Sequence, residues 1–408
     1  MRSQAMRSSG RLMSTNHSQT RGNCLQRAAI LALAAVCFGP VPAALAGNGV
    51  WTTNGPYGVG VQALAVVAPD TLYAGTVFGG VFKSTDGGDS WSAINTGLSS
   101  TNIFTLQVDP AKPTTLYAGS VLDGVFKSTD GGDTWDAAGK TPIGYALAID
   151  PTDADTLYVG TVNGVFKTVD GGGTWNSSGL ADVNVSLVVI DPTVPGTLYA
   201  GTVFDGVFRS TDAGATWSAT GLHPGAFALA LDPGAPGTLY AGTAAGVFKS
   251  SDHGDTWTAT GPNHSAVVYA LASDRDRPGT VYAGVMYADG SGAGGVFVTM
   301  NGGASWTLLD NGLSNTAVGA LVVDATVVGR LYAATGGGVF EIERAASPMP
   351  ECARVGAVTV NDVVIMVDIA LGNAPPGACA NGVGRAGDID VASIIRAVER
   401  ALRGVPLA

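Results

Sequence analysis

Residues 71–91 read TLYAGTVFGGVFKSTDGGDSW, and residues 115–135 repeat this stretch almost intact as TLYAGSVLDGVFKSTDGGDTW. Shorter copies continue along the chain, and the tyrosine of each copy follows the previous one by 44, 41, 41, 41, 42 and finally 50 residues. These seven tyrosines are Tyr73, Tyr117, Tyr158, Tyr199, Tyr240, Tyr282 and Tyr332. A repeat of about 40 residues with four short strands is typical of a β-propeller blade. The sequence therefore predicts an all-β fold with seven blades.

Each repeat predicts four strands. The first is an apolar stretch such as residues 146–149, which ends at Asp150-Pro151 because proline cannot continue a ladder. The second strand is Leu-Tyr-Ala-Gly, the third is Gly-Val-Phe-Lys-Ser, and we expect the fourth to begin at the tryptophan. Alternation of apolar with small or polar residues favours strands over helices throughout.

The tryptophans predict how the ring closes. There are seven, at Trp51, Trp91, Trp135, Trp175, Trp217, Trp257 and Trp306. Trp51 precedes the first complete repeat, whereas the last repeat ends at Glu343 without a tryptophan strand. We therefore expect the strand around residues 50–52 to complete the seventh blade, which joins the chain ends and removes a free sheet edge.

The turn before each of six tryptophans carries the pattern Ser-x-Asp-x-Gly-x-Thr-Trp or a close variant. Its acidic position is filled by Asp86, Asp130, Asp170, Asp212 and Asp252, and by Asn301 in the sixth copy. We expect the carboxylate to accept backbone N–H bonds across the turn and the glycine to adopt a positive φ. The tryptophan is expected to pack between neighbouring blades.

This pattern resembles the Asp-box (BNR) repeats of sialidases, xyloglucanase-type glycosidases, sortilin-type receptors and photosystem-assembly propellers. The resemblance covers about residues 47–344 and implies a propeller with the boxes on its rim, away from any active face. Because such relatives catalyse, bind or scaffold, the resemblance does not decide the function.

The first 46 residues predict a secretory signal peptide. Five arginines precede an apolar run over residues 28–38, and Ala44-Leu-Ala46 offers a cleavage site. The run is too short to span a bilayer, so no membrane insertion is expected. Translation starting at Met6 or Met13, and lipidation at Cys37, are alternatives. We expect a secreted protein, either extracellular or in the periplasm or cell envelope.

The charge of the chain disfavours polyanionic partners. Its 21 basic and 32 acidic residues give a formal net charge of −11. Since the leader holds five arginines and no acidic residue, the remainder carries 16 basic and 32 acidic residues, or −16. An acidic surface repels phosphate backbones and anionic lipids, so nucleic acid and membrane surfaces are not expected partners.

An enzyme site is not apparent in the repeats. A sialidase-like site would need three converging arginines, yet Arg209 replaces the lysine of the repeat and no Arg-Ile-Pro motif occurs. A glycosidase needs two carboxyls roughly 5–9.5 Å apart across a cleft. The face built from the second-to-third strand loops and the blade-to-blade loops offers candidate ligand-binding residues at Phe78, Asp123, Phe204, Asp205, His223, His264, Tyr287 and Asp289. Solvated loop tips are the alternative interpretation of these residues.

Blade six departs from the repeat. It carries an enlarged loop over residues 286–294. Long loops on a rigid scaffold often bind ligands, which favours Tyr287 and Asp289. Insertions also cost little free energy, so tolerated drift is the alternative.

After a linker at residues 345–350, residues 351–408 predict a small α-helical domain. Residues 358–371 and 387–402 are two copies of a loop–helix unit that resembles the dockerin repeat, an EF-hand-like calcium loop followed by a helix. The resemblance implies a cohesin-like partner. The calcium loops look eroded, since few oxygen ligands remain at Thr359, Asp362, Asp388 and Asp390. We expect no cofactor, with calcium as the alternative, and a helix pair that a Cys352–Cys379 disulfide would lock.

Two functions compete. The favoured one is a secreted, non-catalytic propeller that binds a protein or glycan, with a dockerin-like tail for attachment, assembly or stabilisation. The alternative is a divergent glycoside hydrolase.

Overall fold

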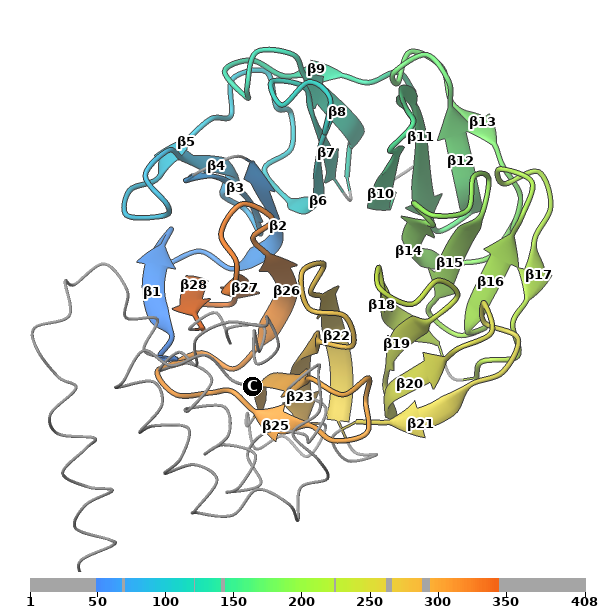
Figure 1. Ribbon diagram of the computed structural model, residues 1–408. Coiled ribbons are helices and arrows are strands. Elements are labelled where there is room, and N and C mark those ends of the chain that lie inside the picture. The colour runs from blue at the N-terminus through green and yellow to red at the C-terminus, as the bar shows by residue number, and fades with distance from the viewer. Residues whose placement is uncertain are drawn as a thin grey trace, which may run out of the picture. The chain divides into compact units, whose positions relative to one another are not determined.

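The computed structural model describes residues 49–67, 70–120, 122–140, 144–223, 225–261, 266–287 and 294–344. Within these residues, 28 strands form seven four-stranded antiparallel sheets, and no helix occurs. The sheets are the blades of a closed ring, and the first strand of each lies nearest the centre (Figure 1). The predicted seven-bladed propeller is confirmed. The leader, the linker and the helical domain predicted at 351–408 lie outside the described residues.

The first four blades follow the chain in order. Blade 1 holds β2 (Val61–Val67), β3 (Thr71–Thr76), β4 (Gly80–Ser84) and β5 (Ser92–Ala93). Blade 2 holds β6 (Ile103–Val108), β7 (Leu116–Ser120), β8 (Gly124–Ser128) and β9 (Asp136–Ala137). Blade 3 holds β10 (Gly144–Asp150), β11 (Asp153–Thr161), β12 (Gly164–Thr168) and β13 (Asn176–Ser177). Blade 4 holds β14 (Val185–Ile190), β15 (Leu198–Thr202), β16 (Val207–Ser210) and β17 (Ser218–Ala219).

Blades 5 and 6 again follow the chain in order, and blade 7 combines the first strand of the propeller with its last three. Blade 5 holds β18 (Ala226–Leu231), β19 (Leu239–Thr243), β20 (Gly246–Ser250) and β21 (Thr258–Thr260). Blade 6 holds β22 (Ala266–Ser273), β23 (Val281–Tyr287), β24 (Gly294–Thr299) and β25 (Thr307–Leu308). Blade 7 holds β26 (Val318–Val323), β27 (Arg330–Thr335), β28 (Gly338–Glu343) and, as its outer strand, β1 (Thr52–Gly55).

The glycine of the Leu-Tyr-Ala-Gly strand lets neighbouring blades approach closely. A Cβ placed on Gly75 would lie 2.8 Å from Cγ2 of Ile103 in the next blade, and one on Gly242 would lie 2.7 Å from Val268. Real Cβ atoms do not make such contacts, so a larger residue would push the blades apart. The packing of one blade on the next therefore explains why this glycine recurs in the repeat.

The fourth strands begin one residue later than the sequence predicts. They start directly after the tryptophan and span two or three residues, apart from β1 with four. In blades 2 and 7 the tryptophan N–H is bonded to the preceding blade: Trp135 N donates to Thr96 O at 2.9 Å, and Trp51 N donates to Asn311 O at 2.8 Å. A backbone N–H used between blades is not available for pairing within its own blade.

The turn between the third and fourth strands joins one blade to the next. We call it the Asp turn; the six copies span residues 84–91, 128–135, 168–175, 210–217, 250–257 and 299–306. Gly131 O in blade 2 accepts hydrogen bonds from Tyr73 Oη at 3.1 Å and Lys83 Nζ at 3.0 Å, both in blade 1. The Lys83 ammonium also lies 5.6 Å from the centre of the Tyr73 ring.

The same joint recurs at the next three blade pairs, and between blades 5 and 6 the lysine alone makes it, from Lys249 Nζ to Gly302 O at 2.8 Å. Tyr117 and Lys127 bond to Gly171 O, and Tyr158 and Lys167 bond to Ala213 O. In blade 4 an arginine takes the lysine position, and Tyr199 and Arg209 bond to His253 O. Each tryptophan indole then donates back to the preceding blade, as from Trp175 Nε1 to Ala138 O at 2.9 Å. The predicted packing of the tryptophans between blades is confirmed.

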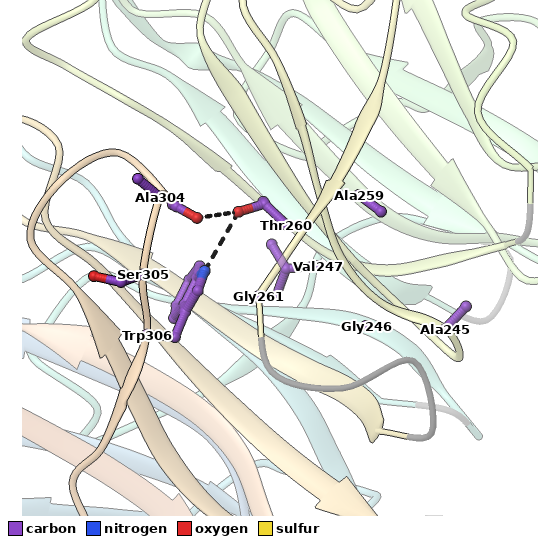
Figure 2. Close-up of a pocket in the computed structure, with 10 residues that line it drawn as sticks. Ala245, Gly246, Val247, Ala259, Thr260, Gly261, Ala304, Ser305 and Trp306 are labelled. Atoms are coloured by element: carbon purple, nitrogen blue, oxygen red, sulfur yellow. Dashed lines mark hydrogen bonds between the residues drawn. The ribbon is translucent and has the colours of Figure 1, made fainter.

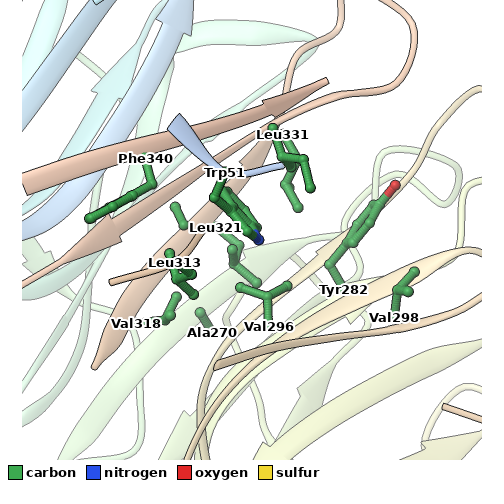
Figure 3. Close-up of a cluster of buried hydrophobic side chains, with 12 residues drawn as sticks. Trp51, Ala270, Tyr282, Val296, Val298, Leu313, Val318, Leu321, Leu331 and Phe340 are labelled. Carbon is green, nitrogen blue, oxygen red and sulfur yellow. The ribbon is translucent and has the colours of Figure 1, made fainter. Parts of the chain in front are cut away.

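The N-terminal strand closes the ring as the sequence predicts. β1 pairs antiparallel with β28, with Thr52 opposite Glu341. Trp51 is 3% exposed, and its Nε1 donates to Leu309 O of blade 6 at 2.7 Å. Figure 3 shows its indole among Leu313, Val318 and Phe340, which belong to a cluster shared by blades 6 and 7. Trp51 thus takes the place that the other tryptophans take in their blades.

Replacing Trp51 with alanine is expected to lower the free energy of unfolding by about 3–5 kcal/mol, because it leaves a cavity where both chain ends meet. Urea titration followed by circular dichroism measures the change. Trp51→Phe is the matched control: it keeps most of the buried ring and loses the bond to Leu309 O, so a smaller loss is expected. An unchanged unfolding midpoint for Trp51→Ala would show that this strand does not hold the ring closed.

Candidate functional site: the tip face

Two sets of loops form one face of the ring, which we call the tip face. They are the hairpin tips between the second and third strands and the connections from each fourth strand to the next blade. The described tips are residues 77–79, 122–123, 162–163, 203–205, 244–245 and 336–337, and the described connections are 56–60, 94–102, 138–140, 178–184, 220–223 and 309–317. The opposite face, the turn face, carries the Asp turns and the turns between first and second strands.

Four large apolar side chains project from the tip face. Tyr57 is 74% exposed, Phe78 79%, Leu122 68% and Phe204 77%. Phe78, Leu122 and Phe204 occupy the same position in the tips of blades 1, 2 and 4. Phe78 and Phe204 are among the residues predicted from the sequence, and Leu122 is not, although aligning residues 71–91 with 115–135 places it opposite Phe78. Tyr57 is not among them either, because its position depends on how the ring closes.

Backbone hydrogen bonds fix these tips against the neighbouring connections. Val77 N donates to Gly60 O at 2.9 Å and Gly80 N donates to Thr101 O at 2.8 Å, so the tip of blade 1 is held on both sides. Phe78 adopts a φ of 67°, which a bulky residue rarely takes. Packing does not explain an exposed aromatic in this conformation, and such outliers cluster at binding and active sites.

A bulge in the first strand of every blade adds a set of residues near the centre of the ring. The register shifts place the bulge at Gln62, Phe104, Tyr145, Ser186, Phe227, Tyr269 and Gly319. Bulged residues of neighbouring blades meet: the Phe227 and Tyr269 ring centres are 5.4 Å apart, and a Cβ on Gly319 would lie 3.4 Å from Gln62 Oε1. Four of the seven are aromatic and partly exposed, and we call them the bulge ring: Phe104, Tyr145, Phe227 and Tyr269.

The charged groups on the described tip face are mostly carboxylates. They are Asp123, Asp182, Asp205 and Asp310, with Lys140 as the single ammonium group, and all five are exposed. Asp123 accepts a hydrogen bond from Ser99 Oγ at 2.7 Å, and the backbone N of Asp205 donates to Thr202 Oγ1 at 2.8 Å. Asp123 and Asp205 are predicted from the sequence, whereas Asp182 and Asp310 in the blade-to-blade connections are not.

The predicted carboxylates are not arranged as a hydrolase pair. Asp123 and Asp205 belong to blades 2 and 4, so blade 3 lies between them. Both are exposed, and no hydrogen bond or ion pair described in the structure joins them. A glycosidase pair would face each other across roughly 5–9.5 Å of a cleft.

The remaining predicted ligand-binding residues lie elsewhere or outside the described residues. His223 is exposed in the connection after blade 4, beside the tip that carries Phe204: a Cβ on Gly206 would lie 3.7 Å from His223 N. Tyr287 is the last residue of β23, where its backbone pairs with Ala266. His264 and Asp289 lie outside the described residues. The binding role of all eight residues stays a prediction.

The Asp turns have the hydrogen bonds that the sequence predicts. Asp86 Oδ1 accepts from Ser84 Oγ at 2.7 Å and from Ser90 N at 2.9 Å, and the other four aspartates repeat this pattern. Asn301 substitutes directly: its Oδ1 accepts from Ser305 N at 2.9 Å, and its Nδ2 donates to Ser305 Oγ at 2.8 Å. The turn carboxylates therefore serve the fold and lie away from the tip face.

Hydrogen bonds lower the pKa of each turn carboxylate. The side-chain and backbone bonds from Ser90 lower the pKa of Asp86 to about 2. The pKa values of Asp170, Asp212 and Asp252 also fall to about 2, chiefly through bonds from Thr168, Thr216 and Thr256. Thr134 lowers the pKa of Asp130 in the same way. The turns are therefore anionic at neutral pH and hold their bonds most strongly in that form.

Three cavities are described, and none is lined by a predicted ligand-binding residue. The first, of about 410 Å³, lies between the outer strand of blade 5 and the Asp turn of blade 6. Figure 2 shows Thr260 facing Trp306 there, with the indole Nε1 donating to Thr260 Oγ1 at 3.5 Å. A similar groove of about 280 Å³ lies between blades 2 and 3. The widest, about 850 Å³, is lined by the turn-face ends of inner strands, including Ile190, Leu231 and Val323.

No metal site is found in the described part of the chain, where no group of three or more His, Cys, Asp or Glu residues could hold an ion. The described residues also contain no helix that is long and apolar enough to cross a bilayer. The predicted calcium ligands Thr359, Asp362, Asp388 and Asp390 and the cysteines Cys352 and Cys379 lie outside the described residues.

Comparison with known proteins shows the fold. No protein-family model matches the chain, and no curated protein sequence matches it. Among solved structures, the GH74 xyloglucanase from Xanthomonas campestris is similar, with a TM-score of 0.57 and 18% identity. That match covers 72% of this chain and 53% of the enzyme, so the chain spans about half the length of the xyloglucanase.

Two further solved structures are also similar to the chain. The extracellular domain of BT4673 from B. thetaiotaomicron has a TM-score of 0.57 and 17% identity, covering 72% of this chain and 39% of that one. YCF48 from Cyanidioschyzon merolae has a TM-score of 0.56 and 14% identity, covering 72% of this chain and 98% of YCF48. YCF48 has also been solved bound to D1 peptide. At these identities the matches establish a seven-bladed propeller and leave the function open.

Acid is expected to weaken the Asp turns. Because the folded-state pKa values lie below the unfolded value of about 3.8, their stabilisation is fully present above pH 4 and is lost as the pH falls through about 2. Urea midpoints measured between pH 5 and pH 2 would show this decline. The matched control replaces Asp86, Asp170, Asp212 and Asp252 with asparagine, as blade 6 does naturally, and should decline less. Equal declines would contradict a role for the turn carboxylates in acid sensitivity.

Proposed function

We propose that the protein is a non-catalytic binding module whose tip face holds a protein partner. The observation that carries this proposal is the set of four apolar side chains, Tyr57, Phe78, Leu122 and Phe204, each more than two-thirds exposed on this face. None of the four belongs to a hydrophobic cluster between the blades. Tyr57 Oη donates to Thr53 O at 3.3 Å, but no packing within the ring buries any of these side chains.

The geometry of these side chains suits a protein surface. Aromatic side chains are enriched among the residues that dominate protein–protein binding energy. Backbone bonds hold the tips of blades 1 and 4 to the neighbouring connections, as from Val203 N to Asn184 O at 3.1 Å, so ordering them on binding costs little entropy. Tyr57, Phe78 and Leu122 come from the consecutive blades 7, 1 and 2, which gives a contiguous arc rather than a single pocket.

The bulge ring offers a second contact area at the centre of the same face. Tyr269 is 40% exposed, whereas its neighbours Val268 and Ala270 are buried. An apolar group of the partner at the centre of this face would meet Phe227 and Tyr269, whose ring centres are 5.4 Å apart. Arc and ring together provide the central apolar contacts that a stable interface needs.

The similar structures are compatible with this proposal. YCF48 was solved with D1 peptide, so a seven-bladed propeller of this size is able to hold a peptide. Divergent glycoside hydrolysis is the second candidate, favoured by the similarity to the GH74 xyloglucanase. The placement of Asp123 and Asp205 on blades that are not neighbours argues against it.

We also propose that residues 1–46 direct export, that the Asp turns are Asp-box repeats and that residues 351–408 form a dockerin-like tail for attachment. The extracellular domain of BT4673 shows that this fold is used outside cells. A cohesin-like partner and the eroded calcium loops belong to the same proposal for the tail, with no calcium expected.

Replacing the three tip residues, Phe78→Ser, Leu122→Ser and Phe204→Ser together, is expected to weaken partner binding at least tenfold and to leave the unfolding midpoint unchanged. The matched control is Val169→Ser, which removes an apolar side chain that is 63% exposed in an Asp turn on the turn face. A photo-crosslinker at position 204, and separately at position 169, in the cells that make the protein would identify what touches each face.

A partner captured from position 204, lost when Phe78→Ser and Leu122→Ser are added to the crosslinking variant and kept when Val169→Ser is added instead, supports the proposal. Two results would overturn it. One is capture from position 204 that does not change when Phe78→Ser and Leu122→Ser are added. The other is specific binding on a glycan array that depends on the same tips, which would assign the face to a carbohydrate.

A further inference from the structure

We infer that the partner segment on the tip face is a basic, apolar stretch of polypeptide. This inference rests on the proposed function and adds the chemistry of the ligand. The inference is supported by the charges of the described tip face. Four exposed carboxylates lie on the same face as the apolar tips, and Lys140 is the single ammonium group there.

The carboxylates lie where a partner would meet them. Asp123 and Asp205 directly follow Leu122 and Phe204 in their tips, so each protruding apolar side chain of blades 2 and 4 has a carboxylate beside it. Asp182 and Asp310 lie in the connections after blades 3 and 6, on the same face. An apolar anchor that packs on either tip would bring its flanking residues next to a negative charge.

Three observations argue against an acidic protein or a neutral glycan as the partner. The chain without its leader carries −16, so an acidic protein would be repelled as it approaches. On the described tip face, the single fixed cation is Lys140, against four carboxylates. A neutral glycan could stack on aromatic rings, but Leu122 offers no such ring at the position equivalent to Phe78. Lys or Arg residues spaced between large apolar residues satisfy both features of the face.

Pairing at the rim should act chiefly on the association rate and its dependence on salt. Exposed ion pairs contribute little each, so neutralising one carboxylate is expected to weaken binding by about twofold. Removing Lys140 is expected to strengthen binding by roughly the same factor, since it repels a basic segment. The two opposite changes distinguish an electrostatic match from a general loss of structure.

The test selects random 12-residue peptides, displayed on phage, on the immobilised full chain with counter-selection on the triple tip variant. We expect enriched peptides with net positive charge and at least two large apolar residues. One synthetic enriched peptide then serves as the probe in fluorescence anisotropy. We expect Asp123→Asn with Asp205→Asn to weaken its binding about fivefold, and 0.3 M salt to weaken wild-type binding by a similar factor. The matched control, Asp89→Asn with Asp133→Asn in the Asp turns, should have no effect.

The outcomes separate this inference from the proposed function. Enriched peptides without basic residues, or binding that neither the Asp123/Asp205 pair nor salt alters, would overturn the inference. If the tip variant still weakens such binding, the proposed function survives. Binding that is insensitive to the tip residues as well would overturn both. Circular dichroism of every variant confirms that each is folded.

Discussion

The ring depends on one backbone carbonyl in each Asp turn, which accepts a side-chain donor from the preceding blade. In the turns of blades 2 to 5 it receives a tyrosine hydroxyl and a lysine or arginine, as Gly131 O receives Tyr73 and Lys83. In contrast, Gly302 O of blade 6 receives Lys249 without the tyrosine. The tyrosine is almost fully buried, and the cation lies against its ring. A hydrogen bond from a charged donor contributes about 1.5–3 kcal/mol, more than an exposed ion pair does. A short turn fixed by its own aspartate therefore carries the contact that orients the next blade.

The departures from the repeat follow from this constraint. Blade 7 has no Asp turn, and Val298 of blade 6 stands where other blades have the lysine, opposite Tyr282. The guanidinium of Arg344 lies over the Tyr282 ring instead, at 5.9 Å. At the next joint Glu341 stands at the lysine position, and Asn54 of β1 donates both to it and to Gly87 O. Residues from the two chain ends thus replace the donors that the repeat supplies elsewhere.

The sequence predicts the parts of the molecule that repeat. The spacing of the tyrosines indicates the number of blades, and the unmatched Trp51 indicates closure by β1. What it misses depends on which segments become neighbours in space. Leu122 was visible in an alignment of two repeats, but Tyr57 joins the tip face only because β1 inserts beside β28. The bulge ring was equally hidden, since a bulge is a difference in register between paired strands. Arg344 is separated from Tyr282 by a whole blade in sequence.

The two faces of the ring differ in how many of their residues hold the blades together. Asp turns, tyrosines, lysines and tryptophans form the contacts between blades, and they lie on the turn face and at the rim of the ring. The tip residues take less part in these contacts, because backbone hydrogen bonds such as Val77 N to Gly60 O fix the tips. Placing Phe78 and Phe204 in water adds nothing to the stability of a folded domain. Their exposure on the less constrained face is the reason why the proposed function places the partner there.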